Sequence, residues 1–140
     1  MMASARSWAV DTSVAIAALD AGHAAHAQCR AAVQRYRPAL AGHAASEVFA
    51  VLTRLPGHLA VDPTDAARLI DRVFPEVAWL SESASTALRS RLATTGIVGG
   101  AVYDALVGEA SRTNARRLLT RDLRARRTYD LLGVDYLLVS

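Results

Sequence analysis

The chain has no lysine, so arginine is its only strongly basic residue. All 16 basic side chains among the 140 residues are arginine, and with 13 acidic ones they give a formal net charge of +3. Guanidinium groups stay charged and can donate two parallel hydrogen bonds to phosphate, which suits a nucleic-acid partner. A net charge this small equally fits a solvated surface, and arginine usage can follow genomic base composition. Charge alone therefore leaves both interpretations open.

Cysteine and long apolar runs are also scarce. Cys29 is the single cysteine, which excludes an internal disulfide, and its helical surroundings favour packing over a nucleophilic role. The longest apolar stretch, 44–55, contains polar residues and falls short of the ~20 apolar residues that a membrane helix needs. The first seven residues show no separate apolar segment of a secretory signal. We therefore expect a soluble, cytoplasmic protein that forms one domain over residues 1–140 and has no membrane partner.

Glycine-rich and histidine-rich binding motifs are missing as well. Gly96 and Gly99-Gly100 are not followed by the Lys-Ser or Lys-Thr of a phosphate-binding loop, so no nucleotide site is predicted. These glycines are expected to free the backbone that enters the next helix. His23 and His26 have the i, i+3 spacing of metal ligands, but no third ligand of the right kind is nearby. We interpret them as surface histidines.

Short apolar strands and amphipathic helices alternate along the whole chain. Helices end at breakers such as Pro56-Gly57 and Gly133, and Asp62-Pro63 is typical of a helix start. Because each parallel strand needs a crossover helix to return the chain, this pattern predicts an α/β fold, in which helices flank both faces of a short central parallel sheet. The expected strands span 8–10, 39–41, 76–80, 117–120 and 134–139, and the expected helices span 14–19, 23–36, 44–55, 63–74, 81–93, 99–114 and 123–132.

Four carboxylates stand out against this pattern. Asp11 follows the first expected strand and Asp122 the fourth, so a parallel sheet brings both to its carboxyl edge, where such folds bind ligands. Glu47 and Asp104 lie in helices among apolar residues, where an unpaired charge is strongly unfavourable. Taken singly, the first two could merely cap helices and the other two could face solvent. Together they predict one acidic pocket, whose repulsion a hard divalent cation would relieve.

The segments around these acids resemble the PIN-domain family, and within it the VapC toxins. The resemblance rests on four motifs in order and at matching separations, and it runs from about residue 10 to 139. It implies a PIN-like fold and an acidic site assisted by the hydroxyl of Thr12 or Ser13. It also implies an endoribonuclease that depends on Mg²⁺ or Mn²⁺, forms a homodimer and is blocked by a VapB-type antitoxin. The motifs are Asp11-Thr12-Ser13-Val14, Ser46-Glu47-Val48, Tyr103-Asp104-Ala105-Leu106 and Leu119-Thr120-Arg121-Asp122.

Phosphodiester hydrolysis suggests a role for each acid, because a bound metal can activate water and neutralise charge on the phosphate. Asp11 and Asp104 are expected to be direct or nearly direct ligands. Glu47 is expected to bind through water or to orient the attacking water, and Asp122 to hold a second, weaker ion. Family members often carry an aromatic residue soon after the last aspartate, whereas here Tyr129 follows only after an arginine-rich stretch, so Asp122 ranks below the other three.

Basic residues near these acids have two interpretations. His43 precedes Glu47 by one helical turn and could contact the edge of the site. The arginines of the last third could line the path of the RNA or form a solvated helix face. They are Arg112, Arg116, Arg117, Arg121, Arg124, Arg126 and Arg127.

Two other functions are compatible with four acids. A phosphatase could use Asp11 as its nucleophile, but such enzymes commonly carry a second aspartate two residues on, and Ser13 stands there. A non-catalytic module could use the acids to contact an arginine-bearing partner. Which RNA would be cut depends on surface shape rather than on the shared acids.

Overall fold

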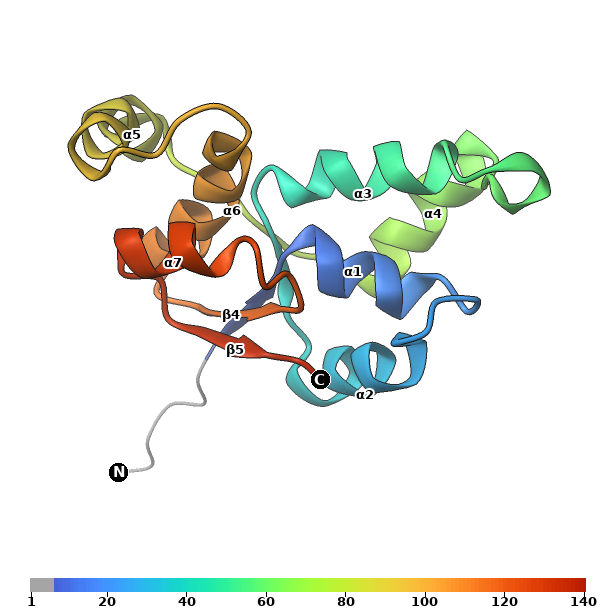
Figure 1. Cartoon of the computed structure of the whole chain (residues 1–140). Helices are drawn as coiled ribbons and strands as arrows, with labels where there is room; N and C mark the ends of the chain where they lie inside the picture. The colour runs from blue at the N-terminus through green and yellow to red at the C-terminus, as the bar shows by residue number, and fades with distance from the viewer. Residues whose placement is uncertain (1–6) are drawn as a thin grey trace.

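The computed structural model describes residues 7–140, and its centre is a five-stranded parallel sheet (Figure 1). The strand order is β3-β2-β1-β4-β5, so the direction of winding reverses between β1 and β4. All four neighbouring pairs are parallel, which confirms the predicted architecture. A reversal of this kind opens a crevice at the carboxyl ends of the central strands. The strands are β1 (Trp8–Val10), β2 (Ala39–Ala41), β3 (Val77–Ala78), β4 (Arg117–Thr120) and β5 (Tyr136–Leu138).

Helices cover both faces of the sheet, as predicted. One group, α1 to α4, packs against one face, and α5 to α7 lie on the other (Figure 1). None of the helices within 7–140 is long and apolar enough to cross a membrane. The helices are α1 (Thr12–Leu19), α2 (His26–Tyr36), α3 (Ala44–Thr53), α4 (Pro63–Val73), α5 (Glu82–Thr95), α6 (Ala101–Thr113) and α7 (Arg126–Leu132), with a short 3₁₀ helix η1 (Gly57–Leu59) after α3.

Two apolar cores lie on the two faces of the sheet because strand side chains alternate. In β4, Leu118 points into the core shared with α6 and α7, whereas Leu119 points into the core shared with α1 to α4. Cys29 is fully buried in the latter core, and burial raises the pKa of its thiol. This agrees with the predicted packing role, because a buried neutral thiol is a poor nucleophile.

Several element boundaries differ from those predicted. β3 is shorter than the predicted 76–80, since a strand extends only where its neighbour offers hydrogen bonds and β2 is itself short. The helix expected from residue 23 begins at His26, because the His23 ring accepts a hydrogen bond from the Ala25 N–H at 3.0 Å and forms a turn. The helix expected from residue 123 begins at Arg126. The predicted cap is correct: Asp62 accepts from the first backbone N–H groups of α4.

The three arginines of the last third that lie at or before the start of β4 all have structural partners. Arg112 forms a two-point ion pair with the buried Glu109, at 2.7 and 3.0 Å. Arg116 donates to the Trp8 carbonyl at 3.0 Å and to the Glu76 carboxylate. Arg117, at the amino end of β4, pairs with Asp135 at 3.2 Å. These three arginines are thus held in contacts within the chain, and the RNA path along the arginine-rich segment stays a prediction.

Gly108 allows α6 and α7 to pack closely. A Cβ atom at this position would lie 2.9 Å from Val134 Cγ2 and 3.0 Å from Tyr129 Cδ1. We expect Gly108→Ala to lower the free energy of unfolding by about 1–2 kcal/mol, because the overpacking cost exceeds the gain in helix propensity. Thermal unfolding would measure this, with Gly100→Ala as the matched control, since nothing lies within 4 Å of a Cβ there. Equal melting temperatures for the two variants would contradict the prediction.

Candidate active site

Asp11 lies at the carboxyl end of β1 and the amino end of α1, and it is buried. Its backbone N–H donates to the Leu119 carbonyl at 3.2 Å, which ties it to β4. Its side chain caps α1 by accepting from the Val14 N–H at 3.3 Å. The capping interpretation is therefore correct, but it accounts for only part of the contacts of this carboxylate.

Four donors converge on the Asp11 carboxylate. Oδ1 accepts from the Ser13 hydroxyl at 2.6 Å and from the Val14 N–H, and Oδ2 accepts from the hydroxyls of Thr120 and, at 3.0 Å, Tyr129. An ionised carboxylate has about four acceptor positions, so these donors hold its orientation on both oxygens. Burial raises the pKa of Asp11, and the hydrogen bonds oppose this rise because they favour the charged form.

Sequence reasoning missed the contribution of Tyr129 and Thr120 to this site. Tyr129 reaches it from α7, and burial followed by the negative charge of Asp11 raises the pKa of its hydroxyl, so Tyr129 stays a hydrogen-bond donor. Thr120 ends β4, and its hydroxyl also accepts from the Asp122 N–H at 3.1 Å. Thr120 belongs to one of the four motifs, whereas Tyr129 was noted only as an aromatic residue that comes late after Asp122. The structure shows that Tyr129 contacts Asp11.

The two candidate hydroxyls after Asp11 differ in their contacts. Ser13 donates to Asp11 and accepts from the Arg121 N–H at 2.9 Å, so it joins α1 to the loop after β4. The Thr12 hydroxyl is buried and has no hydrogen-bond partner within the described residues. Of these two hydroxyls, that of Ser13 contacts Asp11.

Asp122 lies in the loop between β4 and α7, near the carboxyl end of β4. It is partly buried, and its Oδ1 accepts from the Arg124 N–H at 2.9 Å. The Arg124 guanidinium lies 3.8 Å from the same oxygen and is otherwise almost fully exposed. Asp122 does not cap α7, which begins at Arg126 after Ala125 as its N-cap residue. The capping alternative for Asp122 is thus wrong.

Asp104 is close enough to the other three predicted acids for their charges to affect its pKa. It lies in the first turn of α6 and is partly buried. Burial, and after it the negative charges of the other three acids, raises its pKa from 3.8 to about 6, and the Arg124 guanidinium opposes the rise. The amino ends of α1, α3 and α6 gather around this region (Figure 1). The other three acids are Asp122, Asp11 and Glu47.

An aromatic pair, His43 and Tyr103, lies between the helices that carry Glu47 and Asp104. His43 Nε2 lies 3.6 Å from Glu47 Oε1, one turn away on α3. The His43 ring stacks on Tyr103, the residue before Asp104, with ring centroids 5.6 Å apart and planes inclined by 26°. His43 therefore contacts Glu47 at the edge of the acidic region.

The donor chemistry of this region fits a hard cation. Its carboxylates and hydroxyls are oxygen ligands, which Mg²⁺ and Mn²⁺ prefer. Their spacing is not yet that of a coordination shell, since within residues 7–140 no three His, Cys, Asp or Glu side chains are placed so that they could hold a metal ion. The region is an acidic cluster whose charges raise the pKa of Asp104 rather than a closed metal cage.

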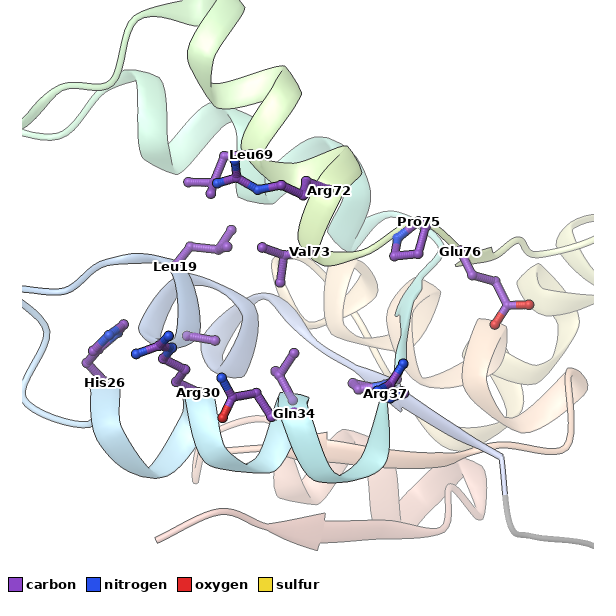
Figure 2. Close-up of a pocket in the computed structure, with 13 residues that line it drawn as sticks. Leu19, His26, Arg30, Gln34, Arg37, Leu69, Arg72, Val73, Pro75 and Glu76 are labelled. Carbon is purple, nitrogen blue, oxygen red and sulfur yellow. The ribbon is translucent and has the colours of Figure 1, made fainter.

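A groove lies between α2 and α4 (Figure 2). Its volume is about 730 Å³, and none of the four acids lines it. Arginine side chains border an apolar floor, so its chemistry differs from that of the acidic region. The floor includes Leu19, Val33, Leu69 and Val73, and the arginines are Arg30, Arg37 and Arg72.

Proteins of known family resemble this chain over almost its full length. Residues 9–131 match the PIN domain family. The chain is 46% identical to Ribonuclease VapC27 of Mycobacterium tuberculosis (strain ATCC 25618 / H37Rv) over 132 residues, which cover 94% of this chain and 96% of the relative. It is 39% identical to Ribonuclease VapC40 of Mycobacterium tuberculosis (strain CDC 1551 / Oshkosh) over 133 residues, which cover 94% and 98%.

Proposed function

The chain belongs to the PIN domain family, and from this premise we propose that it is an endoribonuclease, the toxin of a VapBC-type toxin–antitoxin pair. Two relatives that match it almost end to end are named ribonucleases. The structural observation that carries the proposal is the meeting of Asp11 and Asp122 at the carboxyl ends of β1 and β4, where the Thr120 hydroxyl donates to the Asp11 side chain and accepts from the Asp122 N–H. Burial and the charges of Asp122, Asp11 and Glu47 raise the pKa of Asp104, which agrees with this placement. Like charges gathered at the carboxyl edge of a parallel sheet are unfavourable unless a cation is bound there.

We propose that Asp11, Glu47, Asp104 and Asp122 are the catalytic acids and bind Mg²⁺ or Mn²⁺. When bound, the cation supplies an activated water and neutralises charge on the phosphate. Asp11 is held in one orientation by its four donors, which suits a ligand whose position must be fixed. Glu47 lies 3.6 Å from His43 and can orient water, while the exposed Arg124 beside Asp122 can contact a phosphate.

RNA cleavage with and without metal tests this function. We expect purified chain, free of any partner, to cut single-stranded or looped RNA in Mn²⁺ and not in EDTA. Full activity in EDTA would overturn the proposal. A phosphatase would instead release phosphate from small esters without cutting RNA. The phosphatase is less favoured because Ser13 stands where a second aspartate would be needed, and its hydroxyl is engaged with Asp11 and the Arg121 N–H.

We also propose that the chain forms a homodimer in the cytoplasm and is inhibited by a VapB-type antitoxin. A guanidinium of that partner can occupy the acidic region, because a fixed cation relieves the same repulsion as a metal ion. We therefore expect the double variant Glu47→Gln, Asp104→Asn to weaken the complex about 10-fold or more. Calorimetric titration would measure this, with Asp71→Asn on the exposed face of α4 as control. An affinity equal to that of the control would contradict this mode of inhibition.

A further inference from the structure

An exposed aromatic pair lies directly beside the acidic region. Tyr103 is 57% exposed although it stands one residue before the partly buried Asp104. Its ring stacks on His43, with centroids 5.6 Å apart, and His43 in turn lies 3.6 Å from the Glu47 carboxylate. The pair bridges α3 and α6, the two helices that carry Glu47 and Asp104. An aromatic ring that is more than half exposed therefore lies next to two of the proposed catalytic acids.

The chemistry of this face fits a nucleobase. Single-stranded RNA exposes unstacked bases that bind by stacking on Tyr, Phe, Trp or His rings. An isolated exposed apolar residue needs no explanation, but a large ring supported from behind by a second ring offers a preformed flat surface. The exposed Arg124, 3.8 Å from Asp122, is placed to contact a phosphate at another of the four acids. Base and phosphate contacts are thus available around one set of acids.

We propose that Tyr103, supported by His43, stacks on a nucleobase of single-stranded RNA adjacent to the cleaved phosphodiester bond. This rests on the proposed ribonuclease function and adds a substrate contact to it. Tyr103 binds the base and takes no part in the chemistry, so its loss raises KM far more than it lowers kcat. His43 has a positioning role, because it supports the ring of Tyr103 and contacts Glu47.

Variants at Tyr103 and changes to the RNA test the proposed stacking of Tyr103 on a base. We expect Tyr103→Phe to behave like the wild type and Tyr103→Leu to raise KM about 10-fold with little change in kcat. RNA that lacks the base next to the cleaved bond should show a similar rise with the wild type, and combining both changes should add little more. Trp79→Leu is the matched control, since Trp79 is a 63% exposed aromatic that follows the edge strand β3.

Binding in EDTA, measured by fluorescence anisotropy of a labelled RNA, separates this proposal from the ribonuclease function. There we expect Tyr103→Leu, but not Tyr103→Phe or Trp79→Leu, to weaken binding about 10-fold. Unchanged binding and KM for Tyr103→Leu would overturn the proposed stacking. An equal loss of affinity on intact and base-free RNA would overturn it as well. If the wild type cuts no RNA in Mn²⁺, the ribonuclease function fails, and the anisotropy series alone still decides whether Tyr103 stacks on a base.

Discussion

Asp11→Asn and Asp104→Asn are each expected to lower Mn²⁺-dependent RNA cleavage about 100-fold or more. Loss of a group that only supports a metal ligand typically costs about 10–100-fold, so loss of a ligand should cost at least as much. The amide keeps the size of the carboxylate, and at Asp11 it can still accept hydrogen bonds on one oxygen. We therefore expect both variants to keep the wild-type circular dichroism spectrum.

The control for this experiment is an aspartate outside the acidic region. Asp71 is exposed on α4, and Asp71→Asn should retain wild-type cleavage. Initial rates on one RNA, at several Mn²⁺ concentrations, would measure all three variants. Wild-type rates for Asp11→Asn or Asp104→Asn would exclude that acid from the catalytic set. Restoration of Asp104→Asn by excess Mn²⁺ would assign the loss to metal affinity rather than to folding.

Asp104→Asn is also expected to melt higher than the wild type in EDTA at neutral pH, although it is inactive. The pKa of Asp104 is raised from 3.8 to about 6, mainly by burial and by neighbouring carboxylates. At full burial this difference corresponds to roughly 3 kcal/mol. Because the side chain is only partly buried, solvent screening reduces it to about 1–2 kcal/mol. The variant should therefore melt about 3–8 °C higher.

The pH dependence of this stabilisation has a defined direction. A carboxyl pKa that is higher in the folded than in the unfolded chain disfavours folding when the group is ionised, above about pH 6. The penalty decreases as the pH falls through 6 and is lost below about 4, where both states are protonated. The two melting temperatures should therefore converge in acid. A constant difference across this range would mean that the charge of Asp104 is not its cause.

Metal should reverse the order of the two proteins. A ligand at about a hundred times its dissociation constant stabilises the folded state by about 2.7 kcal/mol, and Asp104→Asn would bind the ion poorly. Melting curves of both proteins in Mn²⁺ and in EDTA would measure this, with Asp71→Asn as a control that should follow the wild type. If Mn²⁺ raises the melting temperatures of wild type and Asp104→Asn equally, Asp104 is not a ligand.

Local sequence determined the order of the elements and the candidates for the site. Strand and helix patterns depend on neighbouring residues, so the parallel α/β sheet could be predicted from alternation and from the need for crossover helices. Capping is similarly local, which is why Asp62 was identified correctly. Asp11 and Asp122 were singled out because residues after parallel strands meet at one edge. Element ends were less predictable, since β3 stops where β2 offers no further pairing.

Only the tertiary structure decided which distant side chains contact each other. Tyr129 hydrogen bonds to Asp11 across 118 positions of the chain, a contact that depends on how α7 packs against α6 and on the space left by Gly108. The stack of His43 on Tyr103 likewise requires α3 and α6 to meet. The side chains present in each segment can be read from the sequence. Hydrogen bonds, stacking and charge interactions between segments act over a few ångströms, so they form only after the segments have packed together.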